Sequence, residues 1–385
     1  MPSLSMETPH HPHRLDKFEF ESTTEVPDSH AWPALAVHDY PSASSPGSES
    51  ESVPLVDLAS TTGDVVAEIG KACEGWGAFQ VVGHDATVEL LDSLESEARR
   101  LFRLPAHRKL GAAKSPGSIT GYGLPPISSF FSKRMWSEGF TISGSPVDDA
   151  RKLWPQDHAR FCEVIEEYNK EMKKLAERLM QLMLLSLGLT GQDDQEEEEE
   201  YFRDITAALQ LNSYPACPEP DRAMGLASHT DSGLLTILHQ SSAASGLQLL
   251  HSDRWVSVPP VPGALVVIIG DLGHVLSNGR FKSVVHRAVV NRTHHRISAA
   301  YLCGPRPDVK VSPIRRPAGR GTRQAYRAVT WREYLGLRAK FFDKAMELLR
   351  VDGDVIIDGD DEQKISSGRN GTGCCCAKQN VAVCM

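Results

Sequence analysis

The sequence has no excess of basic residues, which limits the partners it can bind. It contains 41 lysines and arginines against 50 aspartates and glutamates, and its formal net charge is −9. Seven of the negative charges belong to one run, Asp193, Asp194 and Glu196 to Glu200, which is typical of a solvated loop. Binding to the phosphates of nucleic acids requires a basic surface. We therefore expect no nucleic-acid partner.

Long apolar runs and a disulfide framework are also missing. No stretch of 18 consecutive apolar residues occurs, and the first residues carry no apolar segment like that of a secretory signal. The eight cysteines are either scattered or crowded between Cys374 and Cys384, without the spacing of a disulfide-linked domain. We expect a reducing compartment, the cytoplasm or the nucleus, and no membrane partner. We expect a monomer, although the residues hold no direct signal of oligomeric state.

Changes in composition divide the chain into six parts. Residues 1–50 are rich in Ser, Pro, His and Glu and too polar to repay the entropy of ordering, and the residues from Val351 onward are similar. Apolar residues recur at helical spacing from about Ala159 to Leu187. The expected parts are a disordered tail (1–50), an N-terminal catalytic region (51–158), a long helix and acidic loop (159–200), a β-rich catalytic core (201–310), a C-terminal segment and helix (311–350) and a disordered tail (351–385).

The β-rich core indicates the fold class. Seven short segments with strand composition lie between residues 205 and 304, separated by proline, glycine and Asn-Gly turn signals. Their number and spacing predict a β-sandwich or jelly roll. Residues 115–147 combine glycines with aromatics, which favours a pocket-lining loop or edge hairpin, and Thr330 with Glu333 predicts the start of a terminal helix. We expect an α+β fold, a jelly-roll core (double-stranded β-helix) with an N-terminal helical part and flanking helices.

Three residues of this core have the pattern of a metal site. His229 and Asp231 stand at positions i and i+2, so in an extended segment their side chains share one face. His286 lies among valines, where a buried imidazole without a partner is unfavourable. Each feature alone is more often structural, but together they match the two histidines and one carboxylate of non-haem Fe(II) oxygenases. Such a site leaves three coordination positions open, whereas a zinc hydrolase needs one.

Polar residues on two further segments suit a dicarboxylate cosubstrate. 2-Oxoglutarate fills two of the open positions, O2 takes the third, and the distal carboxylate of 2-oxoglutarate then needs a cation. Arg296 offers a planar guanidinium that can bind it through two hydrogen bonds, and Ser298 shares its face in a strand. Asn212 and Tyr214 add donors on a neighbouring segment. We expect Fe(II) and 2-oxoglutarate to oxidise a C–H bond of a small organic substrate.

Four segments resemble the plant 2-oxoglutarate-dependent dioxygenases, namely HTDSGLLTIL, NGRFKSVVHRAVVN, HRISAAYLCGP and LNSYP. The resemblance spans roughly residues 53 to 350. It implies that iron is held by His229, Asp231 and His286, and 2-oxoglutarate by Tyr214, Arg296 and Ser298. It also implies that decarboxylation of 2-oxoglutarate to succinate and CO2 is coupled to hydroxylation, with ascorbate as reductant.

Residues 121–155 are most similar to the gibberellin 3-beta-dioxygenases, in the part of the chain expected to contact substrate. This similarity implies a diterpenoid acid that is hydroxylated at C-3 beta to give the active hormone. Its carboxylate needs a cation or hydroxyl, and the region offers Ser128, Ser129, Lys133 and Arg134. Two alternatives stay open: a related dioxygenase that performs gibberellin 2-beta-oxidation or flavonoid hydroxylation, and a jelly-roll receptor that binds a small molecule without turnover.

Overall fold

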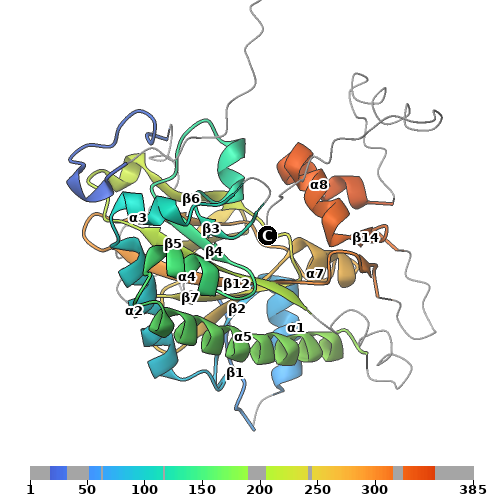
Figure 1. The fold of residues 1–385 in the computed structure, drawn as a ribbon. Helices are drawn as coiled ribbons and strands as arrows, with labels where there is room; N and C mark the ends of the chain where they lie inside the picture. Colours follow the sequence, from blue (N-terminus) through green and yellow to red (C-terminus); the bar gives the residue numbers. More distant parts are fainter. Residues whose placement is uncertain are drawn as a thin grey trace, which may run out of the picture.

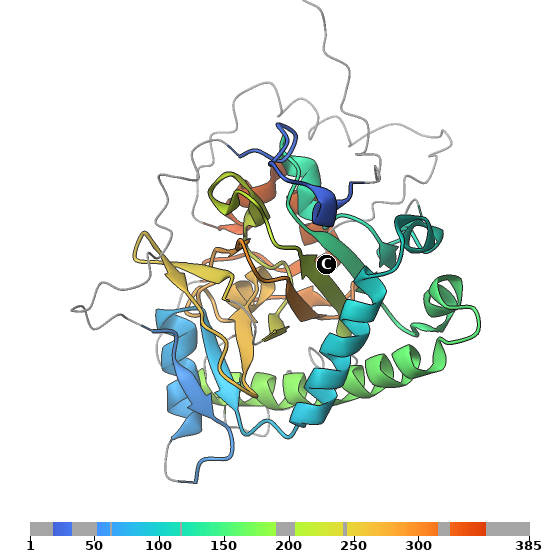
Figure 2. The same cartoon turned by 90° about the vertical axis from the view of Figure 1, so that its left-hand side faces the viewer.

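A computed structural model of the chain describes residues 18–32, 52–61, 64–115, 118–189, 205–241, 245–314 and 324–351. In these residues two β-sheets face each other, and helices cover the outside of the larger sheet (Figure 1, Figure 2). None of the described helices is long and apolar enough to cross a membrane. The acidic run at 193–200 and the cysteines from Cys374 onward lie outside the described residues.

The two sheets are built mostly from antiparallel strands. Within the described residues the larger sheet has the order β1 (Leu55–Asp57), β2 (Ala78–Val82), β10 (Leu265–Ile269), β7 (Leu235–Gln240), β12 (Arg296–Gly304), β5 (Thr206–Tyr214), β4 (Glu138–Ile142) and β3 (Gly121–Tyr122). Only its first pair, β1 with β2, is parallel. The smaller sheet has the order β6 (Met224–His229), β11 (His286–Val289), β8 (Leu247–His251) and β9 (Arg254–Ser257). A third, two-stranded sheet joins β13 (Lys310–Val311) to β14 (Val329–Thr330).

Side chains of the central strands alternate between two environments, as the two-residue period of a strand requires. On β12, Ser298 and Ala300 face a cavity between the sheets, whereas Ile297 and Ala299 join the core beneath the helices. The same division holds on β7, where Leu238 lines the cavity and its neighbour Ile237 belongs to the helix-covered core. Two facing sheets with helices outside form the predicted jelly roll, which is confirmed.

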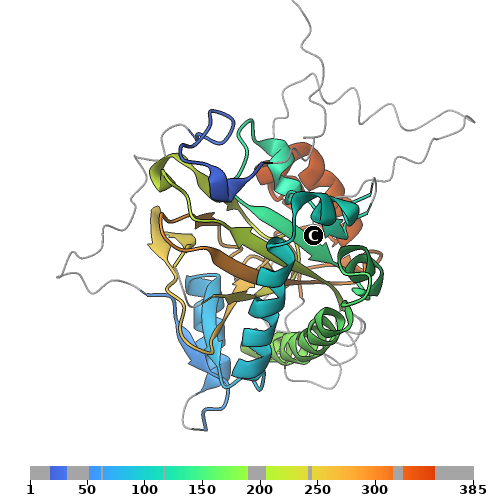
Figure 3. The same cartoon turned by 60° about the vertical axis from the view of Figure 1, so that its left-hand side comes forward.

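Helices α1 (Val65–Gly75), α2 (Val88–Phe102) and α5 (Ala159–Ser186) pack on the outer side of the larger sheet (Figure 3). The starts of α1 and α2 are capped, because the side chains of Asp64 and Thr87 accept hydrogen bonds from backbone N–H groups of the first turn. The predicted long helix is confirmed as α5, and its methionines are buried in the core. The other α-helices of the described residues are α3 (Ala106–Gly111), α4 (Val147–Leu153), α7 (Asp271–Leu276) and α8 (Trp331–Phe341).

One strand was missed from the sequence, and one predicted hairpin is present. Strand β6 has the sequence MGLASH, which lacks the β-branched residues typical of strands, and it was not among the predicted segments. Strands β3 and β4 pair at the edge of the larger sheet, with Gly121 opposite Thr141, which confirms the predicted edge hairpin.

The terminal helix begins where predicted and ends early. Thr330 and Glu333 form both hydrogen bonds of the capping box, which confirms the predicted start of α8. Sequence periodicity alone would extend the helix to Leu349. It stops at Phe341 because Phe342 has φ of 44°, in the left-handed region that an α-helix cannot include. The short 3-10 segments η5 (Phe342–Lys344) and η6 (Glu347–Leu349) follow.

Residues 18–32 differ from the disordered tail predicted for residues 1–50. Phe18 and Phe20 pack edge-on against the buried Trp136, with ring centroids 5.6 and 5.1 Å away. Val26 is buried, and Trp32 Nε1 donates to the carbonyl of Arg134 at 2.9 Å. The composition of residues 1–50 as a whole is polar, which hid this short apolar cluster. The prediction of a disordered tail is therefore wrong for residues 18–32. The rest of both predicted tails, Val351 excepted, lies outside the described residues.

Candidate active site

A cavity of about 830 Å³, counted with the solvent at its mouth, lies between the two sheets. Its apolar wall comes from both sheets and from η3 (Pro126–Phe130), and includes Ile127, Leu226, Leu238, Leu247, Ile268 and Leu302. Polar side chains gather mainly around His229 and around Arg296. A mostly apolar cavity with few polar groups is the usual form of a small-molecule site.

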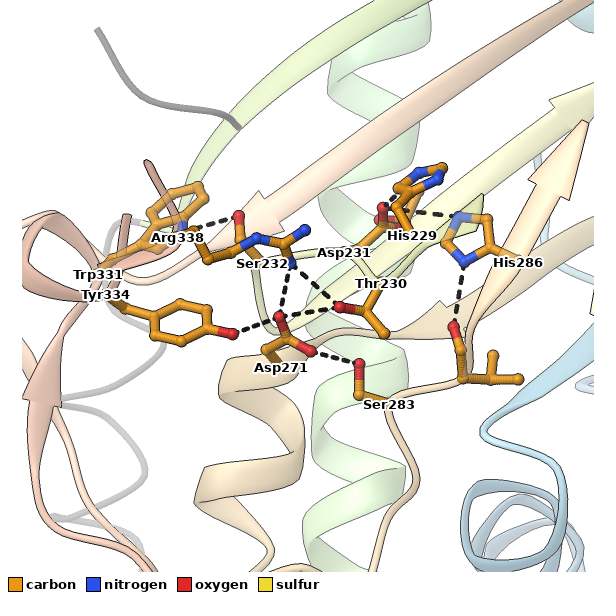
Figure 4. Close-up of polar contacts among 12 residues, drawn as sticks. His229, Thr230, Asp231, Ser232, Asp271, Ser283, His286, Trp331, Tyr334 and Arg338 are labelled. Carbon is orange, nitrogen blue, oxygen red and sulfur yellow. Dashed lines mark hydrogen bonds and ion pairs between the residues drawn. The ribbon is translucent and has the colours of Figure 1, made fainter. Parts of the chain in front are cut away.

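His229, Asp231 and His286 come together on the wall formed by the smaller sheet. Strands β6 and β11 pair with His286 directly opposite His229, and Asp231 lies two residues beyond the end of β6. One ligand atom from each of the three residues lies within 4.8 Å of the others. Asp231 Oδ1 is 3.6 Å from His229 Nε2 and 3.7 Å from His286 Nε2 (Figure 4). The structure thus brings together the three side chains that the sequence pattern singled out.

Each histidine is oriented through the nitrogen that does not face Asp231. His229 Nδ1 lies 2.8 Å from the carbonyl oxygen of Ala227, and His286 Nδ1 lies 3.1 Å from that of Val284. Because a carbonyl can only accept, each Nδ1 is the donor and each Nε2 keeps its lone pair for a metal. Asp231 is held in a similar way, since its Oδ2 accepts from Thr236 Oγ1 at 2.5 Å.

The protonation states also suit a metal. Burial and the neighbouring His286 lower the pKa of His229 to about 3, so this imidazole is neutral at physiological pH. Burial alone would raise the pKa of Asp231, but His286, His229, the hydrogen bond from Thr236 and Arg338 together hold the pKa below its usual value. Metal binding requires neutral imidazole and ionised carboxylate. The donor set, its burial and its orientation therefore fit Fe(II).

A second polar cluster behind these ligands centres on Asp271, the first residue of α7. Asp271 Oδ2 accepts from Tyr334 hydroxyl at 2.5 Å, Arg338 Nη1 at 2.6 Å and Thr230 Oγ1 at 3.1 Å, and Oδ1 accepts from Ser283 Oγ at 2.7 Å (Figure 4). Tyr334 and Arg338 belong to α8, so the cluster connects that helix to the turn carrying the histidine and aspartate ligands. Sequence analysis missed it because its members are far apart in the chain.

Arg296, Ser298, Asn212 and Tyr214 line the cavity together. Strands β12 and β5 pair with Arg296 opposite Tyr214 and Ser298 opposite Asn212, which brings the four predicted side chains to one place. Burial raises the pKa of the Tyr214 hydroxyl, and its contacts with Arg296 and Ser298 partly offset this effect. Within the described part of the chain these residues form a compact group of hydrogen-bond donors.

The guanidinium of Arg296 is incompletely satisfied. Its Nη2 donates to Gln240 Oε1 at 3.1 Å, and its Cζ lies 5.1 Å from the centre of the Tyr214 ring. Among the described residues, its buried Nε has no hydrogen-bond partner. Leaving a buried charged donor unpaired is unfavourable. An Nε aimed at a missing acceptor therefore fits a bound carboxylate such as that of 2-oxoglutarate.

The four residues expected to hold the substrate do not line this cavity. Ser128 Oγ contacts the sulfur of Met135 at 3.9 Å, and Lys133 Nζ donates to the carbonyl of Asp28 at 2.7 Å. Ser129 is exposed, and the backbone of Arg134 is bonded to the 18–32 segment. The region does reach the cavity, but through Pro125 and Ile127. Proximity in sequence could not reveal which side chains of this loop turn inward.

Aromatic residues from three distant segments meet beside the loop that carries Ile127. Trp32 lies 5.3 Å from Phe131, Phe131 lies 5.7 Å from Phe342, and Phe342 stacks on Phe130 at 4.5 Å between ring centroids. This aromatic cluster, Trp32, Phe130, Phe131 and Phe342, joins the N-terminal segment, η3 and the end of α8. It therefore supports the part of the cavity wall that lies outside the sheets.

Comparison with known protein families agrees with this arrangement. Residues 205–305 match the family model of the 2OG-Fe(II) oxygenase superfamily. Residues 53–159 match the N-terminal model of a non-haem dioxygenase in morphine synthesis. The first match contains all three metal-ligand candidates and all four predicted 2-oxoglutarate residues.

Individual relatives extend the comparison over most of the chain. Gibberellin 3-beta-dioxygenase 1 of Arabidopsis thaliana is 50% identical over 336 residues, which cover 86% of this chain and 92% of that protein. Gibberellin 3-beta-dioxygenase 2-3 of Triticum aestivum is 47% identical over 352 residues, covering 89% and 94%. The crystal structure of JOX2 in complex with 2OG, Fe and JA is 32% identical, with a TM-score of 0.70 over 81% of this chain and 89% of that chain.

Proposed function

The chain belongs to the 2OG-Fe(II) oxygenase superfamily, and from its similarity to gibberellin 3-beta-dioxygenases we propose that it hydroxylates a gibberellin precursor at C-3 beta. It is a 2-oxoglutarate-dependent dioxygenase that uses Fe(II), with ascorbate as the usual reductant. The observation that carries the choice of substrate is the 50% identity to a gibberellin 3-beta-dioxygenase over 92% of that protein. The substrates are then a diterpenoid acid, 2-oxoglutarate and O2.

We propose that His229, Asp231 and His286 hold the iron. Support comes from the 3.6 and 3.7 Å separations of their ligand atoms and from the carbonyls that turn each Nε2 inward. Iron with 2-oxoglutarate and O2 supplies the oxidising chemistry, in which 2-oxoglutarate becomes succinate and CO2. The contribution of the three side chains is to fix the metal on one wall of the cavity and leave the opposite side for cosubstrate and O2.

We propose that Arg296 binds the distal carboxylate of 2-oxoglutarate. The supporting observation is its buried Nε, which lacks a partner within the described residues, beside an Nη2 held by Gln240. Tyr214 and Ser298 place hydroxyl groups next to the guanidinium, and Asn212 adds an amide on the neighbouring strand. Together these groups fix the position of the cosubstrate, and none of them carries a negative charge that could bind the iron in its place.

The apolar wall keeps the rest of the reaction away from water. Leu226, Leu247 and Ala288 come from the smaller sheet, and Ile268 and Leu302 face them from the larger one. Such walls hold a rigid hydrocarbon skeleton in one pose, and the carbon nearest the metal is then the one oxidised. Position C-3 beta follows from that pose and not from the chemistry of the metal, which is shared across the superfamily.

Product analysis tests the proposal directly. Purified protein would be incubated with Fe(II), ascorbate, 2-oxoglutarate and a panel of gibberellin precursors together with a flavonoid, and the products identified by mass spectrometry. We expect 3-beta-hydroxylated gibberellins as the main products, in step with succinate release. A spectrum dominated by 2-beta-hydroxylation, turnover of the flavonoid alone, or binding without turnover would each replace the proposal by one of the alternatives considered for the sequence.

We further propose a cytoplasmic location and a monomeric enzyme. The location fits the four described cysteines, Cys73, Cys162, Cys217 and Cys303, all of which are free thiols. A fluorescent fusion in plant cells and light scattering of the purified protein would test these two statements separately. Fluorescence confined to a secretory compartment, or a scattering mass of two or more chains, would contradict them.

A further inference from the structure

An acid that sits in a largely apolar cavity needs a cation in the cavity wall, because a buried carboxylate without one is strongly unfavourable. Among the described residues, three arginines line the cavity and no lysine does: Arg287, Arg296 and Arg338. Arg287 is held elsewhere, since its Nε donates to Gln248 Oε1 at 2.8 Å and its Cζ stacks 4.0 Å from the centre of the Trp255 ring. Neither Gln248 nor Trp255 lines the cavity. Arg296 lies in the group proposed for 2-oxoglutarate.

Arg338 is placed to meet a ligand beside the metal site. It is 4% exposed, and its Nη1 donates to Asp271 Oδ2 at 2.6 Å and to Thr230 Oγ1 at 3.1 Å. Two such bonds fix the plane of the guanidinium before any substrate arrives, which reduces the entropy lost on binding. Figure 4 shows Arg338 reaching from α8 toward Thr230, on the side where Asp231 and His229 lie.

Arg338 is bound to the turn that carries two of the metal ligands. Thr230, whose Oγ1 accepts from Arg338 Nη1 at 3.1 Å, stands between His229 and Asp231 in the chain. An anion bound to this guanidinium would therefore lie close to the three proposed iron ligands, within the reach of a single small substrate.

Arg338 also lies close to apolar side chains. Its Cζ lies 5.8 Å from the centre of the Phe342 ring, which belongs to the aromatic cluster. Ile127 and Leu226 line the cavity in the same region as Phe342, since all three join one apolar cluster. A hydrocarbon skeleton attached to a carboxylate would find a cation and an apolar wall next to each other here.

We propose that Arg338 binds the carboxylate of the diterpenoid acid and thereby sets which carbon lies over the metal. This inference rests on the proposed function, because it assumes that a gibberellin acid is the substrate. It replaces the side chains of the 128–134 loop as the polar anchor. Asp271 is a positioning residue in this arrangement, since it holds the guanidinium of Arg338 and has no place in the lining of the cavity.

The test compares a gibberellin precursor with its methyl ester, which has the same skeleton and no carboxylate charge. The native enzyme should prefer the free acid by roughly 10- to 100-fold in kcat/KM, the size expected for a charged hydrogen bond. In R338Q the value for the free acid should fall by that factor, the value for the ester should barely change, and the preference should disappear. The KM for 2-oxoglutarate should stay as in the native enzyme.

Two further variants guard against a purely structural effect. R338Q leaves the buried Asp271 with a weaker partner, so D271N/R338Q, which makes both members neutral amides, should restore stability without restoring the preference for the acid. R332Q removes an exposed arginine from the same helix and should leave kinetics unchanged. Circular dichroism would verify the fold of each variant.

The outcomes separate this inference from the proposed function. If the native enzyme forms no hydroxylated gibberellin, the proposed function fails and the inference fails with it. If it hydroxylates gibberellins at C-3 beta but prefers acid over ester equally in native and R338Q forms, only the inference is overturned. Parallel losses for acid and ester in R338Q, maintained in the double variant, would likewise mean that Arg338 acts through the fold and does not bind the carboxylate.

Discussion

A buried imidazole is a useful metal ligand only when its other nitrogen is held by an acceptor, because only then does the inward nitrogen keep its lone pair. His229 and His286 each meet this condition through a backbone carbonyl two residues earlier in the chain, at Ala227 and Val284. Orientation is thus supplied by local backbone geometry. The more distant cluster around Asp271 fixes the turn between the first two ligands, since Thr230 donates to it.

At the proposed iron site, we expect His286→Ala to abolish turnover while the fold survives. The two remaining ligands cannot offset the loss of a third. Iron content of the purified variant, its circular dichroism and its decarboxylation of 2-oxoglutarate would be measured together. The exposed His294 provides a matched control, and its replacement by alanine should leave all three measurements as in the native enzyme. A well-folded His286→Ala protein with near-native turnover would remove His286 from the site.

At the 2-oxoglutarate site, Arg296→Lys should raise the KM for the cosubstrate roughly tenfold or more. Lysine keeps the charge but cannot form the paired hydrogen bonds of a guanidinium, a loss of about 1 to 3 kcal/mol. The KM for the gibberellin should change less. Steady-state kinetics with each substrate varied in turn would check this, and an unchanged KM for 2-oxoglutarate would show that the carboxylate binds elsewhere.

Some of the proposed functional residues can be predicted from their spacing in the sequence, and others cannot. His229 and Asp231 stand two positions apart, and Arg296 and Ser298 repeat that spacing, so the period of a strand reveals each pair. Asp271, Tyr334 and Arg338 have no such relation, because they meet only after α7 and α8 have packed. Sequence analysis offered Ser128, Ser129, Lys133 and Arg134 as substrate residues and did not consider Arg338, because the place of Arg338 in the cavity depends on tertiary contacts.

At the scale of elements, sheets and loops contribute different things to the cavity. Strands β5, β6, β11 and β12 carry the proposed iron and 2-oxoglutarate residues in fixed register, except Asp231, which follows the end of β6. The loop with Ile127 and the end of α8 lie outside the sheets and are joined by the aromatic cluster. Rigid strands therefore position the reacting groups, whereas the substrate wall depends on the packing of less regular segments.

Removing residues 1–32 should destabilise the enzyme, in contrast to the neutral effect that polar composition alone would suggest. The deletion exposes Trp136 and removes the buried Val26 together with the contact of Trp32 with Phe131. We expect the free energy of unfolding to fall by about 2 to 4 kcal/mol and the KM for the gibberellin to rise. Thermal unfolding and kinetics would measure both effects.

Deletion of residues 1–17 is the matched control for this truncation, since every described contact of the 18–32 segment is kept. The shorter deletion should leave the melting temperature and both KM values close to native. If the two truncated proteins had the same melting temperature and the same KM values, the stabilising role of the 18–32 segment would be contradicted.

At the scale of the whole molecule, stability should fall as the pH is lowered from 7 toward 4.5. Burial lowers the pKa of His30 to about 4 with help from Arg134, and burial lowers the pKa of His295 to about 4 with help from Arg99. The unfolded values are about 6.5. Between these values the unfolded chain binds more protons than the folded one, so acid favours unfolding.

Urea unfolding at pH 7 and pH 5 would check this expectation. His30→Phe removes one of the two titrating groups and keeps a ring that can stack on Phe18, as His30 does at 4.3 Å between centroids. The variant should lose less stability than the native protein over this range, by up to about 1 kcal/mol after allowance for solvent screening. Identical losses would mean that His30 titrates alike in the folded and unfolded chain.

The overall architecture was largely predictable because it depends on patterns that repeat. Seven short segments of strand composition, separated by turn signals, indicated the jelly roll, and the capping box of Thr330 and Glu333 located the start of α8. The structure does not separate the N-terminal part from the core, since β2 and β4 join the same sheet as β7 and β12. The division at residue 158 therefore remains a proposal about organisation, and a shared sheet argues that the two parts fold together.

The aromatic cluster has a consequence for the order in which a newly made chain acquires its properties. Both sheets, with the proposed iron and 2-oxoglutarate residues, are complete once Gly304 has left the ribosome. Trp32 and Phe131 have emerged long before, but Phe342 can pack on Phe131 only when almost the whole described chain has been translated. A nascent or prematurely terminated chain would thus contain the metal-binding residues before the wall of the substrate cavity is complete. Such a chain would consume 2-oxoglutarate without a substrate to hydroxylate.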